Sequence, residues 1–229
     1  MIKEQYLQVQ ADVAHMCEQS GRSTEACTLV AVSKTKPVEM LSEAYEAGCR
    51  DFGENKVQEI LDKYDKLPAD IRWHMIGHLQ TNKVKYIVDK VYMIHSVDSV
   101  RLAREISKEA VKKQVNVPVL LEVNVAEEAS KYGFSVGELL DAVREIATLP
   151  GIQVKGLMTI APFVENSEDN RVYFSQLKQL AVDISDKNID NIDMNILSMG
   201  MTGDYLVAVS EGATYVRVGS GIFGNRIYH

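Results

Sequence analysis

The amino-acid sequence predicts an α/β fold: a single (β/α)8 barrel of the TIM type, preceded by an extra N-terminal helix. Three observations support this prediction, namely eight short apolar runs, amphipathic stretches between most of them, and a length of 229 residues. Several runs are almost continuously aliphatic, which is typical of parallel strands covered on both faces. An open doubly wound sheet is the alternative. Because the chain shows no linker and no break in composition, residues 1–229 are expected to form one domain.

Sequence periodicity places the elements in chain order. An N-terminal helix is expected because apolar residues recur every three or four positions, at Ile2, Tyr6, Val9 and Val13. Helical stripes also run through residues 139–147 and 174–184. The strands are expected at residues 28–33, 51–53, 72–77, 90–95, 118–124, 154–160, 195–198 and 214–218.

Composition restricts the classes of function. The net charge of −7 argues against bulk nucleic-acid binding, which usually requires a basic face. No apolar run approaches the roughly 18 residues that a membrane span needs, and the segment MIKEQYLQVQ lacks the apolar core of a signal peptide. Cys17, Cys27 and Cys49 form no CxxC pair and no zinc spacing. The sequence therefore predicts a cytoplasmic protein that binds neither nucleic acid nor membrane.

A lysine, Lys34, directly follows the first predicted strand and could act as a nucleophile. In an α/β barrel, functional groups gather where strands run into the following loops. Lys34 lies at such a point, so it is expected near the barrel mouth and half removed from water. Desolvation and the neighbouring cation Lys36 would both lower its pKa and free the amine to form a Schiff base with an aldehyde. The structural alternative is two solvated lysines at a helix start before Pro37.

Two glycine-rich turns follow the last two predicted strands, at residues 198–203 (SMGMTG) and 219–221 (GSG). Small residues let backbone N–H groups approach a phosphate, and the end of the last strands is a recurrent phosphate site in barrels. The sequence lacks GxGxxG after a strand and GxxxxGK[ST], which argues against a dinucleotide or P-loop site. Arg217 lies within the last strand, either as a functional cation or in a structural ion pair.

His74 and His78 are four residues apart in WHMIGH and are expected to share a face of the third strand. A third ligand at a suitable spacing is missing from the sequence, so no metal site is predicted. The hydrolase motifs HExxH and GxSxG are also absent from the sequence.

Several stretches together resemble a known family. They are VAVSKTKP around Lys34, FGEN (52–55), WHMIGHLQTNK (73–83), GLMTIAP (156–162) and SMGMTGDYLVAVSEGATYVRVGSGIFGNR (198–226). In order, from about Leu29 to Arg226, they resemble the pyridoxal phosphate homeostasis protein family, whose members are similar to the N-terminal barrel of bacterial alanine racemases. Two positions depart from the family pattern: Lys56 replaces a tyrosine, which puts any role of that tyrosine in doubt, and Thr202 replaces a serine.

The resemblance implies that the cofactor is pyridoxal 5′-phosphate (PLP), held as a Schiff base on Lys34. It implies a cofactor site composed of Lys34, Asn55, Ser198, Met199, Thr202, Arg217, Gly219 and Ser220, with Lys36 and Lys131 as accessory lysines. The two turns would hold the phosphate through Ser198, Met199, Thr202, Gly219 and Ser220. Arg217 would face the pyridine nitrogen.

The same resemblance implies a non-catalytic carrier or buffer of PLP, with PLP-dependent enzymes as candidate clients. A PLP-dependent racemase-like enzyme is the first alternative, and a barrel enzyme acting on a phosphorylated metabolite is the second. A racemase needs an acid/base group on each face of the substrate carbon. The sequence ends at His229 without a second racemase domain and has Ile160 where racemase barrels place a ring-stacking histidine. The sequence is therefore interpreted as a carrier, and as a monomer because no large exposed apolar patch is evident.

Overall fold

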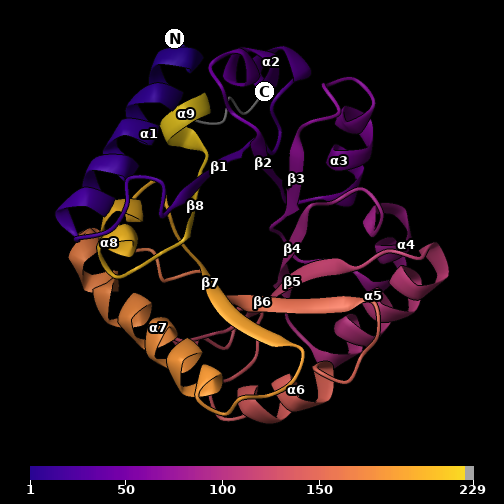
Figure 1. Cartoon of the computed structure of the whole chain (residues 1–229). Coiled ribbons are helices and arrows are strands. Elements are labelled where there is room, and N and C mark those ends of the chain that lie inside the picture. The colour runs from indigo at the N-terminus through magenta and orange to yellow at the C-terminus, as the bar shows by residue number, and fades with distance from the viewer. Residues whose placement is uncertain (225–229) are drawn as a thin grey trace.

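Eight parallel strands close into one barrel in the computed structural model, which describes residues 1–224 (Figure 1). Each strand pairs with the next along the chain and the last pairs with the first, so the predicted barrel is confirmed. The strands are β1 (Thr28–Val32), β2 (Asp51–Glu54), β3 (Arg72–Met75), β4 (Met93–Val97), β5 (Val117–Glu122), β6 (Ile152–Met158), β7 (Ile192–Met201) and β8 (Tyr215–Val218).

Helices surround the barrel. They are α1 (Ile2–Gln19), α2 (Val38–Glu46), α3 (Val57–Tyr64), α4 (Val84–Ile87), α5 (Val100–Lys113), α6 (Leu139–Ile146), α7 (Arg171–Ser185), α8 (Tyr205–Ser210) and α9 (Ser220–Phe223), with short 3-10 turns η1 (Thr81–Lys83) and η2 (Ser167–Asn170). The predicted extra helix is α1, which lies against α8, α9 and α2 on the outside of the barrel (Figure 1). Among the described residues, no helix is both long and apolar enough to cross a membrane.

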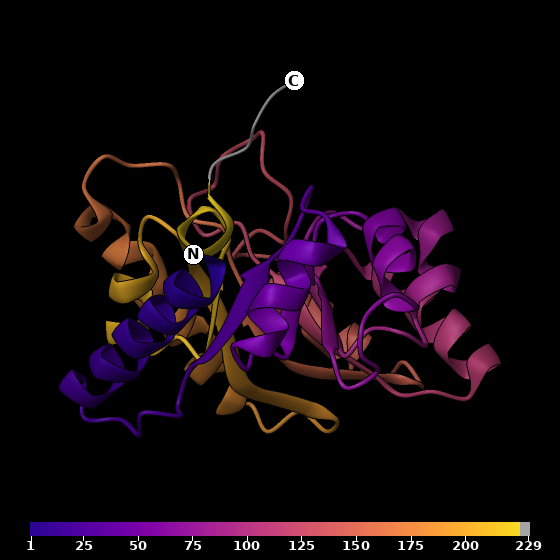
Figure 2. The same ribbon diagram turned by 90° about the horizontal axis from the view of Figure 1, so that it is seen from above.

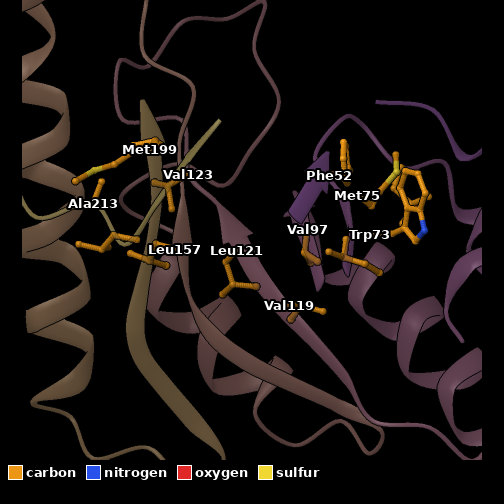
Figure 3. Close-up of a cluster of buried hydrophobic side chains, with 14 of the residues drawn as sticks. Phe52, Trp73, Met75, Val97, Val119, Leu121, Val123, Leu157, Met199 and Ala213 are labelled. Atoms are coloured by element: carbon orange, nitrogen blue, oxygen red, sulfur yellow. The ribbon is translucent and has the colours of Figure 1, made fainter. Parts of the chain in front are cut away.

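Successive side chains along a strand point alternately outward, toward the surrounding helices, and inward, into the barrel. Figure 3 shows Phe52, Trp73 and Met75 together in the outer core, between the strands and the surrounding helices. His74 lies between Trp73 and Met75 in the sequence and points into the barrel, where it is fully buried. The barrel interior therefore holds polar side chains beside a small apolar cluster of Met93, Leu120 and Met158.

The structure differs from two predictions, one on the bounds of the fourth strand and one on the placement of His78. The fourth strand was predicted at residues 90–95 but is Met93–Val97, because the apolar pair Val91 and Tyr92 belongs to the segment that leads into it. The prediction that His74 and His78 share a strand face is wrong because β3 ends at Met75. His78 instead lies in the following loop, hydrogen-bonded to Asp98.

The seventh strand is longer than predicted and contains most of the first glycine-rich segment. β7 runs to Met201, with a register shift against β8 between Ser198 and Met201. Gly200 has a φ of +91°, and a Cβ there would lie 2.5 Å from the Cβ of Ala208 on α8. The glycine therefore permits an irregular strand to pass close to a helix, and the turn itself begins only at Thr202.

Candidate functional site

A cavity of about 760 Å³ opens at the carboxyl ends of the strands. Figure 2 shows the loops after β5 and β6 rising on the same side of the barrel as α9. Segments that follow seven different strands contribute lining residues, among them Lys34, Asn55, Ile76, Lys131, Ile160, Thr202 and Gly219. This is the end of the barrel at which the sequence predicted a site.

Most of the predicted site residues line this one cavity. They are Lys34, Lys36, Asn55, Lys131, Thr202, Arg217, Gly219 and Ser220. Ser198 and Met199 do not line it, because both belong to β7 and their side chains are fully buried. Met199 lies in the outer core, whereas the Ser198 hydroxyl lies inside the barrel in contact with Arg217 and His95.

Lys34 lies two residues beyond the end of β1 and is half-buried, as the sequence predicted. The backbone on both sides of it is held by side chains from neighbouring elements. The Ser33 hydroxyl donates to Oε1 of Glu54 at 2.6 Å, and the Ser33 carbonyl accepts from Nζ of Lys63 at 2.9 Å. The Thr35 N–H donates to Oε2 of Glu59 at 2.5 Å. The position of Lys34 is therefore determined on both sides by one group of charged residues.

These charged residues form a network beneath the Lys34 segment. Nζ of Lys63 lies 2.7 Å from Oε1 of Glu54 and 3.2 Å from Oε2 of Glu59. Burial raises the pKa of Glu54 to about 7 although Lys63 opposes the rise. Burial would also raise the pKa of Glu59, but the Thr35 N–H and Lys63 outweigh it and the pKa is lowered. Thr35 has a φ of +63°, a left-handed conformation that costs on the order of 1 kcal/mol for such a residue, and its N–H bond to Glu59 helps to stabilise it.

The sequence analysis did not identify this network. Glu59 and Lys63 are spaced i, i+4 on α3, which usually indicates only an exposed helix pair. Lys63 is buried instead, because its Nζ donates to the Ser33 carbonyl just after β1 and to Glu54 at the end of β2. The one indication of this network in the sequence is that a charged residue, Glu54, directly follows the apolar pair Phe52-Gly53.

Arg217 on β8 is buried inside the barrel and lines the floor of the cavity. Its Nη1 donates to the Ser198 hydroxyl at 2.6 Å and its Nη2 to the Thr159 carbonyl at 2.9 Å. Burial lowers the pKa of Arg217 to about 10, with Glu122 and Asp204 opposing, so the group is a cation at neutral pH. It forms no salt bridge with a carboxylate within residues 1–224, so the structural ion pair considered from the sequence is not what holds it.

The turns after β7 and β8 are joined through Thr202. Its Oγ1 accepts the backbone N–H of Gly219 at 3.3 Å and of Gly221 at 3.4 Å. A Cβ at Gly203 would meet no atom within 4 Å, and one at Gly219 would lie 3.4 Å from Val32. The backbone of these turns is thus directly accessible from the cavity that both turns line.

The accessory lysines contact different parts of the rim. Lys36 donates to the carbonyls of Phe223 and Gly224 at 3.0 and 3.1 Å, which connects the β1 loop to the end of α9. Lys131 lies 3.6 Å from Glu128 in the loop after β5. Lys56, which departs from the family pattern, is exposed at the start of α3 and does not line the cavity.

Comparison with known proteins agrees with this geometry. The family model described as the alanine racemase N-terminal domain matches residues 9–226. A pyridoxal phosphate homeostasis protein from Aquifex aeolicus is 46% identical over 213 residues, covering 93% of this chain and 92% of that protein. This chain belongs to the pyridoxal phosphate homeostasis protein family. The end of the matching region, residues 225 and 226, lies outside the described residues.

Solved structures support membership of the pyridoxal phosphate homeostasis protein family. A protein of unknown function from Bifidobacterium adolescentis is 36% identical, with a TM-score of 0.92 over 97% of this chain and 94% of that one. PipY from Synechococcus elongatus, whose structure was solved with PLP bound, is 33% identical, with a TM-score of 0.81 over 93% of this chain and all of PipY. The family resemblance seen in the sequence is therefore confirmed over nearly the whole chain.

Proposed function

We propose that this chain binds PLP in the cavity at the carboxyl ends of its strands and acts in intracellular PLP homeostasis. The observation that carries the proposal is the convergence of Lys34, Arg217 and the turns at Thr202 and Gly219 on one cavity. The names of the homologous proteins and the PLP-bound structure of PipY support the same ligand.

The cavity suits PLP in size and in chemistry. A volume of about 760 Å³ lies within the range of small-molecule sites. Lys34 offers an amine for the aldehyde, and Val32, Ile76 and Ile160 offer apolar contacts for the ring. The turns with Thr202, Gly219 and Ser220 offer backbone N–H groups and hydroxyls for the phosphate. When bound, the cofactor supplies the aldehyde carbon that would be joined to Lys34 as a Schiff base.

Within this site, we propose a phosphate cradle made of fewer residues than the family resemblance implied. The Ser198 hydroxyl already bonds to Arg217 and His95, and the Met199 side chain belongs to the outer core. We therefore propose that Thr202, Gly219 and Ser220 carry the phosphate, and that Ser198 acts on the opposite end of the cofactor through Arg217. Asn55, Lys36 and Lys131 remain proposed neighbours at the rim.

A role as carrier rather than enzyme agrees with the groups that line the cavity. A guanidinium only donates hydrogen bonds, so Arg217, if it faces the pyridine nitrogen of a bound cofactor, would keep that nitrogen unprotonated and make the ring a weak electron sink. Racemization requires a positioned acid or base on each face of the substrate carbon. The described lining residues include no tyrosine, histidine or cysteine, and Ile160 lines the cavity where the family resemblance would place the ring-stacking histidine of racemases. We therefore propose that PLP is stored and passed on to client enzymes.

The proposal is tested by absorption spectroscopy and by chemical mapping. Wild type purified with PLP should show a Schiff-base band that borohydride abolishes, and peptide mapping should locate the pyridoxyl group on Lys34. Lys34→Ala should lack the band, whereas Lys66→Ala, which removes an exposed lysine after α3, should retain it. Labelling of Lys36 or Lys131 in wild type would show that the attachment site is assigned wrongly.

We further propose that the protein works in the cytoplasm as a monomer. Cys17, Cys27 and Cys49 are free thiols and all are buried, which suits a reducing compartment. Light scattering after size-exclusion chromatography measures the mass of the particle in solution. A mass equal to two chains would refute the proposal that the protein is a monomer.

A further inference from the structure

A continuous row of hydrogen bonds leaves Arg217 and crosses the interior of the barrel. The Ser198 hydroxyl, which accepts from Arg217, lies 2.8 Å from Nδ1 of His95 on β4. Nε2 of His95 lies 2.8 Å from Nδ1 of His74 on β3. Ser198, His95 and His74 are all 0% exposed. Two buried histidines bonded to each other need a reason, because an apolar pair would pack there without any polar group to satisfy.

The row ends at a carboxylate on the opposite side of the barrel. Nε2 of His74 lies 2.9 Å from Oδ1 of Asp51, at the start of β2. Arg72 donates to both oxygens of Asp51, and its side chain is 44% exposed. Asp51 and Arg72 line a second cavity of about 490 Å³, away from the one that holds Lys34. The row therefore joins the two ends of the barrel.

The number of hydrogens available for these hydrogen bonds determines which group donates and which accepts at each step of the row. Arg217 can only donate, so Ser198 accepts from it and its own hydrogen is left for His95. His95 then uses Nδ1 as an acceptor and Nε2–H as a donor to His74, and His74 uses Nε2–H as a donor to Asp51. With a second proton on His74 the row would reverse, and the Ser198 hydrogen would have no acceptor among the described residues.

Electrostatics agrees with one proton on His95. Burial, together with the Arg217 cation, holds the pKa of His95 well below its usual value. At the far end, burial would raise the pKa of Asp51, but hydrogen bonds from Arg72 and His74 outweigh it and keep the carboxylate ionised. The anion accepts the last N–H in the row, and each bond polarises the next.

We propose that Ser198, His95, His74 and Asp51 form a positioning row that orients Arg217 toward the ring of the bound cofactor; this inference rests on the proposed function. Because the Ser198 hydrogen is given to His95, the hydroxyl presents a lone pair to Arg217. The Thr159 carbonyl accepts from the other Nη, and the two bonds together set the plane of the guanidinium. Asp51 sets the tautomer of His74 and, through it, that of His95.

The first test needs no cofactor. Long-range proton–nitrogen NMR on histidine-labelled, PLP-free protein should show the shared protons of His95 and His74 on Nε2 of each ring, with the pKa of His95 lowered. Ser198→Ala removes the donor to Nδ1 of His95 and should change the nitrogen shifts of His95 but not of the exposed His15. A His95 that carries its proton on Nδ1, or whose pKa is not lowered, would overturn the row.

The second test compares two replacements of His95 in PLP-loaded protein. In His95→Gln the amide can donate to His74 and its oxygen can accept from Ser198, whereas His95→Phe fills similar space without either bond. The phenylalanine variant should bind PLP about tenfold more weakly and shift the absorption band, because Arg217 loses an oriented acceptor. The glutamine variant and the control His78→Gln, outside the barrel, should both resemble wild type.

The outcomes separate this inference from the proposed function. Equal losses in His95→Gln and His95→Phe, with folded protein by circular dichroism, would mean that only the shape of His95 matters and would overturn the positioning role. If wild type itself fails to bind PLP, the proposed function fails, while the NMR result still decides whether the row exists in the direction described.

Discussion

Replacing Lys63 with methionine should destabilise the protein strongly, and more at high pH than at low pH. Methionine keeps the length of the side chain but removes the ammonium group, which lies 2.7 Å from Glu54 and 3.2 Å from Glu59 and donates to the Ser33 carbonyl at 2.9 Å. Glu54 is 0% exposed, and without Lys63 only the Ser33 hydroxyl would donate to it among the described residues.

The magnitude follows from the burial of the pair. Removing one partner of a buried ion pair costs about 3–5 kcal/mol, because the other charge is left uncompensated. We expect a loss of about 3 kcal/mol, at the lower end of this range, at pH 8, and a larger loss at higher pH. At pH 5 the carboxyl group of Glu54 is protonated, so the loss should fall to about 1–2 kcal/mol, the cost of the missing hydrogen bonds.

The pH dependence has a definite sign. The pKa of Glu54 is raised to about 7 by burial. The folded protein therefore holds the proton of Glu54 more tightly than the unfolded chain does. The free energy of unfolding falls as the pH rises from about 4.5, the ordinary pKa of the group, to about 7, its pKa in the folded protein. Without Lys63 the pKa rises further. The variant should then continue to lose about 1.4 kcal/mol per pH unit above pH 7, where the contribution of Glu54 in wild type levels off.

Urea unfolding followed by circular dichroism between pH 5 and pH 8 measures these values. Lys66→Met is the matched control, since Lys66 is exposed just beyond the same helix. The double variant Glu54→Gln with Lys63→Met removes both charges and should recover more than half of the loss at pH 8. A loss for Lys63→Met that is equal at pH 5 and pH 8, or no larger than that of Lys66→Met, would refute the reasoning.

Two further predictions concern the cavity, and a third concerns the buried Glu122 at the end of β5. Pyridoxal, which lacks the phosphate, should bind at least about tenfold more weakly than PLP in a fluorescence titration, and Thr202→Val should narrow that difference because Thr202 joins the two turns. Burial and the nearby Asp98 raise the pKa of Glu122 to about 7, so ionisation of this group makes the folded protein less stable as the pH rises from 4.5 to 8. In Glu122→Gln this decrease in the free energy of unfolding should be smaller by on the order of 3 kcal/mol. An unchanged pH profile of stability would contradict this. PLP-loaded wild type should not catalyse solvent deuterium exchange at the α-carbon of L- or D-amino acids, and multiple turnover that disappears in Lys34→Ala would show an enzyme instead.

Part of this site could be predicted because its signals are local. The apolar run before Lys34 predicted a strand, and a lysine directly after a barrel strand must lie near the mouth. The same reasoning placed Gly219 and Ser220 after β8. Ser198 and Met199 were expected at the cavity for the same reason, but the glycine that suggested a turn is an irregularity inside β7.

The sequence by itself determined the fold class and which residues lie at the carboxyl ends of most strands, because both depend on residue type and on spacing within one strand–loop unit, while the cofactor followed from the family resemblance. Only the tertiary structure decided which polar groups meet. Lys63 reaches Ser33, thirty residues earlier in the chain, and His95 meets Ser198 at a separation of 103 residues. Such contacts depend on the register and tilt with which eight strands close into a barrel, and closure is a property of all the strands together.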